Sequence, residues 1–231
     1  DLNEWDDYAV EEAVQISEEH DDIEVVTATI GPERAEETIR QALAKGADRA
    51  VRVWDDSLEG ESLVDTATKA ELLAAVVEEE EPDFVFSGVQ SADFAFASTG
   101  VALASEIGSQ WAAVVNEFEL DRDAGLARVH RELEGGVEEL TEVDLPAVFT
   151  IQTGINEPRY ASLRGIRQAQ SKPLDVHTPE ELGVDLEGSA LSLTSLREPE
   201  SESDATYFEG SAEETAAELA TFLREEKGVG A

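Results

Sequence analysis

The sequence predicts an α/β fold built on a parallel sheet, with an added β-hairpin region and an extended C-terminal arm that ends in a helix. Between residues 9 and 108, segments with apolar residues three or four apart alternate with short β-branched segments. This is the pattern of parallel strands joined by helical crossovers. Residues 112–154 then contain four short strand-like segments in succession, and residues 211–226 form a last amphipathic segment.

The first half of the chain predicts helices and strands in alternation. Apolar residues from Ala9 to Ile16 form a helical stripe within 9–20. The β-branched run 23–31 ends in Gly-Pro, which is typical of a strand buried on both faces. The following helix starts at Pro32 and ends at Lys45-Gly46. The remaining elements expected here are a strand at 47–56, a helix at 65–80, a strand at 82–90 and a helix at 101–108.

The second half of the chain changes to short strands, which are expected at 112–121, 126–134, 136–144 and 146–154. Gly135-Gly136 separates two alternating runs and predicts a hairpin turn. After Pro173 the chain is expected to be irregular, with a linker in the Ser- and Glu-rich stretch around 197–204. We therefore expect an α/β domain at 1–175, followed by an arm and a helix at 176–231.

The charge of the chain limits its partners. Sixteen Lys and Arg residues stand against fifty-four Asp and Glu residues, which gives a formal net charge of −38. Nucleic-acid phosphate and anionic membrane surfaces both require basic patches, so neither is expected as a partner. The acids are spread along nearly the whole chain. This distribution suits concentrated salt, which screens their mutual repulsion, and it predicts a halophilic source.

What the sequence lacks excludes several kinds of site. It has no cysteine, which fits a reducing cytoplasm, and no apolar run of the ~20 residues that membrane insertion requires. The three histidines have no metal-ligand spacing, and no serine lies in a nucleophile elbow. Neither a catalytic residue nor a metal site is predicted. Because the chain begins on the approach to a helix and without methionine, its natural N-terminus is expected to lie upstream of Asp1.

Two predicted strands end in glycine-bearing segments, at 28–34 and 87–100. In parallel α/β sheets, ligand sites collect at the carboxyl ends of the strands. The second segment runs through Ser98, Thr99 and Gly100 into a helix, where backbone N–H groups can approach a phosphate. This predicts a Rossmann-like nucleotide-binding domain; the alternative is that the glycines are turns and that Ser98 or Thr99 is a helix cap. The spacing matches neither GxGxxG nor a Walker A loop, which argues against a dehydrogenase or a P-loop ATPase.

Four stretches of the chain resemble one known family, in the same order. INEPRYASL at 155–163, followed by a basic helix start and KPL, resembles the signature of the electron transfer flavoprotein beta subunit. DLNEWDDYAVEEAV resembles the family's NPFDEYAVEEAL, and GPERAEETIRQALAKGADRAVRV resembles its segment that ends in GADRA. VHRELEGGVEELTEVDLPAVFT resembles its hairpin. These stretches cover most of residues 1–175, and the chain is identified as a member of this family that lacks the family's first strand and loop.

The resemblance implies an electron carrier and not an enzyme with a substrate of its own. An alpha subunit would hold most of the FAD, while this chain would cover part of the flavin and bind AMP. The heterodimer would carry electrons from acyl-CoA and related dehydrogenases to a membrane quinone reductase, and residues 176–231 would contact the alpha subunit. Two alternatives remain: a bifurcating relative with a second FAD in the AMP site, and a stand-alone adenine-nucleotide sensor of related fold.

The matched motifs also imply site residues. Asn3 matches an asparagine near the AMP, and Trp5 matches an aromatic residue close to the flavin. Ile30 and Gly31 match backbone positions of the nucleotide loop. The family's QAIDDDxNQTG stretch implies nucleotide contacts from Gln90, Asp93, Ser98, Thr99 and Gly100. The chain departs from the family here, with one acid for two or three and Ala97-Ser98 for Asn-Gln, so the ligand is either AMP or a second FAD.

The signature segment, about residues 155–170, is the loop that docks onto partner dehydrogenases in this family, with a leucine as anchor. Leu163 holds that place, and Arg164 and Arg167 are its cationic neighbours. An apolar anchor with nearby charges suits a short-lived encounter, because the charges accelerate approach. For Arg159 and Tyr160, the alternative is that they tie the loop to its own fold or to the alpha subunit.

Overall fold

The structure is a computed structural model of the chain, and it describes residues 2–59, 65–185, 191, 194–195, 197–198 and 205–225. The chain divides into two compact units, Asp1–Leu193 and Thr194–Ala231. This division lies further along the chain than the expected boundary at 175. All of the residues expected at binding or docking sites belong to the first unit.

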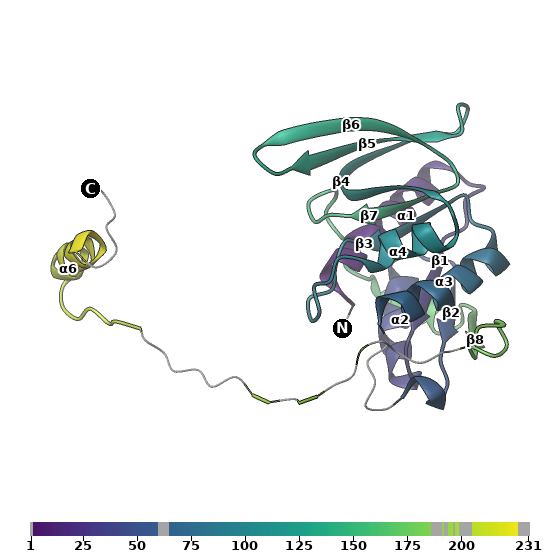
Figure 1. Cartoon of the computed structure of the whole chain (residues 1–231), viewed down its shortest axis with the longest axis horizontal. Coiled ribbons are helices and arrows are strands. Elements are labelled where there is room, and N and C mark those ends of the chain that lie inside the picture. The colour runs from purple at the N-terminus through teal and green to yellow at the C-terminus, as the bar shows by residue number, and fades with distance from the viewer. Residues whose placement is uncertain are drawn as a thin grey trace. The chain divides into compact units, whose positions relative to one another are not determined.

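The first unit contains two sheets with parallel strands, which confirms the predicted α/β fold (Figure 1). The smaller sheet has the order β1-β2-β8, all parallel, with β1 at Val26–Ile30, β2 at Arg49–Val53 and β8 at Leu174–His177. The larger sheet has the order β3-β7-β4-β5-β6, formed by β3 (Phe84–Gly88), β4 (Gln110–Asp121), β5 (Leu126–Leu133), β6 (Val137–Asp144) and β7 (Ala147–Ile151). Strands β3, β7 and β4 are parallel, whereas β4, β5 and β6 form an antiparallel meander.

The predicted β-hairpin is confirmed as the turn between β5 and β6. Gly135 and Gly136 have φ angles of 78° and 74°, which glycine adopts without steric strain. Leu133 and Val137 form the last pair of residues across the hairpin.

Helices pack against both sheets (Figure 1). Helix α1 (Glu4–Glu19) packs against β3, β7 and α2 (Glu36–Lys45). Helix α3 (Thr66–Glu80) packs against β1 and α4 (Thr99–Glu106), and α5 (Leu163–Ala169) packs against α2. Two short 3-10 helices, η1 (Glu33–Ala35) and η2 (Asp56–Leu58), follow β1 and β2. The predicted helices and strands before residue 155 are therefore all present.

The position of a strand in its sheet decides how deeply it is buried. Strand β2 lies in the middle of its sheet and is buried over four of its five residues. Strand β1 lies at the edge of the same sheet, and Ala28 at its centre is exposed. The prediction of a strand within 23–31 is confirmed, but the prediction that it is buried on both faces is wrong. An apolar run indicates a strand but does not show its position in the sheet, and β1 is an edge strand.

The prediction that the chain is irregular after residue 173 is wrong for β8. Leu174 of this strand pairs with Ala50 of β2. The guanidinium of Arg40, on α2, donates hydrogen bonds of 2.7 Å to the carbonyl oxygens of Ala169 and Lys172. These contacts hold the chain beside β2, and a four-residue strand is too short to show a periodic pattern.

The second unit contains α6 (Ala212–Glu225), which confirms the predicted C-terminal helix. Ser211 and Glu214 form a capping box, in which the Ser211 N–H donates to Glu214 Oε2 at 2.9 Å and the Glu214 N–H donates to Ser211 Oγ at 3.4 Å. Leu219 and Leu223 of this helix are exposed. The predicted linker around 197–204 lies almost wholly outside the described residues. No helix in the described part of the chain has both the length and the apolar composition of a membrane span.

Candidate nucleotide site and docking segment

Asn3 ties the start of α1 to the loop that follows β3. Its Nδ2 donates to the Gln90 carbonyl oxygen at 2.9 Å and to Asp6 Oδ2 at 2.8 Å. Its Oδ1 accepts from the Ala92 N–H at 3.2 Å. The structure therefore brings together Asn3 and Gln90, two of the residues expected near the nucleotide, although they are far apart in the sequence.

Trp5 lies directly over the end of β3 and is held at both ends of its side chain. A Cβ atom added to Gly88 would lie 2.7 Å from Trp5 Cβ and 2.7 Å from the Asp6 nitrogen, so only glycine allows α1 this close. The indole Nε1 donates to Gln152 Oε1 at 3.0 Å, and the Thr153 N–H donates to the same oxygen at 2.9 Å. Since Trp5 belongs to none of the three buried apolar clusters, it is an oriented aromatic surface and not core.

The start of α4 packs closely against the larger sheet and has free backbone N–H groups. The first amides of a helix, here those of Thr99 and Gly100, have no acceptor within the helix. A Cβ atom on Gly100 would collide with Ser87 Oγ and would lie 2.6 Å from Thr150 Cγ2. Ser87 Oγ is itself buried and has no hydrogen-bond partner among the described residues. The helix start thus lies against the sheet, with donors at its open end.

The starts of α3 and α4 lie side by side. Thr66 Oγ1 and Ser98 Oγ are 3.1 Å apart, and Lys69 Nζ lies 5.5 Å from the centre of the Phe94 ring. Hydrogen bonds from the Ser91 hydroxyl and the Phe94 N–H lower the pKa of Asp93. The loop between β3 and α4 therefore presents an ionised carboxylate at neutral pH, with one lysine close by.

Ile30 and Gly31 belong to the other sheet. The Gly31 N–H donates to the Val53 carbonyl oxygen at 3.2 Å, and the buried Arg52 donates to the Gly31 carbonyl oxygen at 3.2 Å. Within the described parts of the chain, no hydrogen bond or ion pair joins these residues to Asn3 or to the loop after β3. The expected site residues therefore fall into two groups, on β1 and around the end of β3.

Sequence reasoning missed several residues of this region. Asp6, Ser87 and Gln152 contact expected site residues, and Lys69 acts electrostatically on Asp93, but none of the four was predicted. For the close packing of α1 on β3, the glycine near the end of the predicted strand 82–90, Gly88, was a usable signal in the sequence. No local sequence pattern marks Asp6, Ser87, Lys69 or Gln152, because each is recognised only by a contact with a distant part of the chain.

Arg159 ties the signature segment to α1. Its Nε donates to Glu11 Oε2 at 2.9 Å, and its Nη1 donates to Glu18 Oε1 at 2.6 Å. The alternative that Arg159 holds the loop to its own fold is therefore confirmed, and its charge is neutralised by carboxylates more than 140 residues away in the sequence. Tyr160, in contrast, is 98% exposed, and no hydrogen bond joins its side chain to another residue that the structure describes.

Two neighbouring carboxyls of α1 respond differently to burial. Burial works to raise the pKa of Glu11, but hydrogen bonds from Arg159 and Gln15 outweigh it, so the pKa is lowered. Burial raises the pKa of Glu12, and the hydrogen bond from Asn156 offsets only part of the increase. The ionised form is therefore favoured at the arginine contact and disfavoured at the amide contact.

Leu163 is 78% exposed at the first turn of α5. The preceding residue, Ser162, caps this helix by accepting a hydrogen bond from the Gly165 N–H at 3.0 Å. Arg164 and Arg167 are also exposed. The residues expected to dock onto a partner therefore all lie on the surface.

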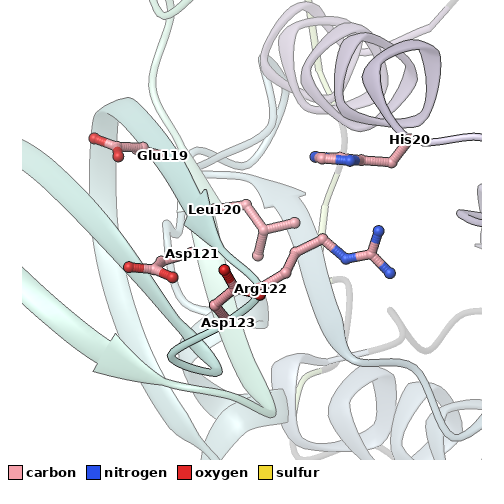
Figure 2. Close-up of a pocket in the computed structure, with 6 residues that line it drawn as sticks. All are labelled: His20, Glu119, Leu120, Asp121, Arg122 and Asp123. Carbon is pink, nitrogen blue, oxygen red and sulfur yellow. The ribbon is translucent and has the colours of Figure 1, made fainter.

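Two surface hollows lie away from these residues. One is lined by His20, after α1, and by the end of β4 with the turn that follows it; Figure 2 shows His20 and Arg122 extending into the same space. The other lies around Pro82, Ser109 and Pro146. Neither contains an expected site residue. Among the described residues, no group of three or more His, Asp or Glu side chains is arranged to hold a metal ion.

Comparison with known proteins identifies the family of the chain. Residues 1–182 match the electron transfer flavoprotein domain family. The chain is 47% identical over 234 residues to the electron transfer flavoprotein subunit beta of Methylophilus methylotrophus, covering 99% of this chain and 87% of that protein. It is 36% identical to the beta subunit of Bradyrhizobium diazoefficiens, covering 99% and 86%, and 38% identical to that of Homo sapiens, covering 86% and 76%. The chain therefore belongs to the electron transfer flavoprotein family, as a beta subunit and an electron carrier.

Proposed function

We propose that this chain pairs with an alpha subunit to hold one FAD. The two-subunit carrier is located in the cytoplasm, where it accepts electrons from acyl-CoA-type dehydrogenases and passes them to a membrane-bound quinone reductase. It turns over no substrate of its own. The observation that carries the proposal is the exposed Leu163 at the start of α5, next to a loop that Arg159 fixes to the fold. An exposed apolar anchor on a fixed support suits brief, repeated contact with several dehydrogenases.

The end of β3 and the start of α4 fit an adenine nucleotide. The free amides at the start of α4 provide donors for a phosphate, and the absence of a side chain at Gly100 lets this helix start lie against Ser87 and Thr150 of the sheet. Thr99 is the first residue of that helix, and Asn3 and Gln90 close the neighbouring loop. We assign the nucleotide here, with Asp93 as an acceptor for hydroxyl groups, and we take AMP as the ligand in preference to a second FAD.

The flavin supplies the electron-transfer chemistry when it is bound. In this proposal, Trp5 contributes an aromatic surface on the flavin side, oriented by Gln152 and by the close contact at Gly88. The family motif also assigns Ile30 and Gly31, at the end of β1 in the other sheet, to the nucleotide loop; the Gly31 N–H and carbonyl oxygen are bonded to Val53 and Arg52, which would hold the backbone of that loop in place. The residues of this chain therefore bind and orient the cofactors.

Residues 176–231 are assigned to contact with the alpha subunit. The exposed Leu219 and Leu223 give α6 an apolar side, and a helix of this kind is covered in the assembled protein. A stand-alone nucleotide sensor would need neither this side nor an exposed Leu163.

Release of ligands from the native protein, followed by mass spectrometry, tests the proposal. We expect a yellow, two-chain protein that yields FAD and AMP in equal amounts. Two FAD per heterodimer without AMP would instead support a bifurcating carrier. A colourless single chain that yields only an adenine nucleotide would overturn the carrier proposal.

We also propose a halophilic source, because a net charge of −38 on 231 residues is strongly self-repelling in dilute buffer. The midpoint of urea unfolding should rise between dilute buffer and about 1 M KCl, where the Debye length falls to about 3 Å. A midpoint that is equal or lower in KCl would contradict this proposal.

A further inference from the structure

Residues 152–162, here called the strap, run from the end of β7 to the start of α5 and are attached to α1 at three places. The first attachment is the hydrogen bond from Trp5 Nε1 to Gln152 Oε1. The second is Asn156, whose Nδ2 donates to the Tyr8 carbonyl oxygen at 3.1 Å and to Glu12 Oε2 at 2.9 Å. The attachments thus follow the order of residues along α1.

The third attachment, at Arg159, has the most hydrogen bonds of the three. Glu11 and Glu18 are seven residues apart and lie on the same face of α1. Both guanidinium edges are used: Nε and Nη2 donate to the Glu11 carboxylate at 2.9 and 3.0 Å, and Nη1 and Nη2 donate to Glu18 at 2.6 and 2.9 Å. The Arg159 backbone N–H also donates to Glu11 Oε2 at 3.0 Å. Glu11 is only 3% exposed, whereas the Arg159 side chain is 32% exposed, so the buried Glu11 carboxylate fixes the inner edge of the guanidinium in one geometry.

The chain is fixed again immediately after the strap. A Cβ atom on Gly165 would collide with the Ala44 carbonyl oxygen of α2, so α5 lies directly on that helix. Between Arg159 and Gly165, the side chains of Tyr160 and Leu163 are 98% and 78% exposed. Two large side chains with apolar surface are therefore held out in solvent by contacts on either side of them.

We propose that Arg159 is a positioning residue for docking: by binding Glu11 and Glu18, it holds the strap so that Tyr160 and Leu163 face a partner dehydrogenase. The inference rests on the proposed function for its partner, but the order of the strap can be measured without one. A segment fixed in advance pays less conformational entropy when it binds. This suits a carrier that must bind and leave quickly.

The test compares Arg159→Gln and Arg159→Lys with the unsubstituted chain, each in the assembled two-subunit protein. Two quantities are measured: hydrogen exchange of the strap amides, and the second-order rate of flavin reduction by a partner dehydrogenase. Arg159→Gln should speed exchange across residues 155–162 and slow reduction, each by about tenfold or more, with FAD content unchanged. Arg159→Lys keeps the positive charge, but an ammonium group cannot make paired hydrogen bonds to both carboxylates. Its exchange and reduction rates should therefore lie between those of the unsubstituted chain and those of Arg159→Gln.

Two controls separate the possible causes. Arg122→Gln breaks a paired contact with Asp22, 2.8 and 2.5 Å long, which lies just beyond the C-terminal end of α1 and does not involve the strap; it should leave strap exchange and reduction unchanged. Glu18→Gln removes only the exposed carboxylate, so it keeps the fold and should act in the same direction as Arg159→Gln but more weakly.

Three results would overturn the positioning role. They are unchanged strap exchange in Arg159→Gln and Glu18→Gln, faster exchange with an unchanged reduction rate, and an equal slowing in Arg122→Gln. If Leu163→Ala also leaves the reduction rate unchanged, then docking through this segment fails as a function. In that case strap exchange still reports whether Arg159 fixes the segment.

Discussion

Replacement of Leu163 by alanine is expected to slow flavin reduction by a partner dehydrogenase by about 10- to 150-fold, while the FAD content and the unfolding midpoint stay unchanged. The reason is that a fully buried leucine side chain contributes about 1.5–3 kcal/mol, and each 1.4 kcal/mol is about a tenfold change in affinity. In the free protein the side chain is 78% exposed, so its removal takes little from the fold. Stopped-flow measurement of flavin absorbance, under conditions where the rate depends on partner concentration, gives the rate constant.

Leu140→Ala is the matched control for this experiment. Leu140 lies on β6 and is 81% exposed, so its replacement removes an equally exposed leucine from another part of the surface. It should leave the reduction rate unchanged. An unchanged rate in Leu163→Ala, or an equal loss in both variants, would remove the docking assignment.

Gly88→Ala is expected to lower the free energy of unfolding by about 1–3 kcal/mol or more and to weaken nucleotide binding at the same time. The new methyl group would lie 2.7 Å from the Asp6 nitrogen and 2.8 Å from the Trp5 carbonyl carbon. Because these are backbone atoms, the start of α1 must move away from β3. That movement would break the contacts of Asn3 with the loop after β3 and the contact of Trp5 with Gln152.

Urea unfolding and AMP retention after gel filtration measure the two effects. Gly125→Ala is a suitable control: Gly125 has a φ of 68° and no atom within 4 Å of an added Cβ. It should lose only about 1–2 kcal/mol from backbone strain and retain AMP fully. Full stability together with normal AMP retention in Gly88→Ala would show that α1 does not depend on this close contact.

The predicted elements before residue 155 depended on patterns within single elements. Alternating apolar residues marked β5 and β6, and a Gly-Gly pair marked the turn between them, because both features act over a few residues. Strand β8 has only four residues, and Arg40 of α2 binds the chain just before it, at Ala169 and Lys172. Its position depends on a distant helix, so local periodicity missed it.

The residues of the candidate site were predicted through motifs, and the structure places them in two groups. Asn3 and Gln90 are hydrogen bonded to each other, whereas Gly31, directly after β1, is hydrogen bonded to β2 in the other sheet. Gln152, which orients Trp5, was missed because a single glutamine after a strand has no distinguishing pattern. Gln152 reaches Trp5 only because the fold packs β7 against α1.

The sequence by itself determined the alternation of helices and strands, the hairpin, the absence of thiol chemistry and the motifs of the electron transfer flavoprotein family. These depend on residue type and on spacing within one or two turns. Only the tertiary structure decided that Glu11 and Glu18 neutralise Arg159 while Leu163 remains exposed. The physical reason is that an ion pair spanning 148 residues forms only after packing brings α1 beside the chain that follows β7.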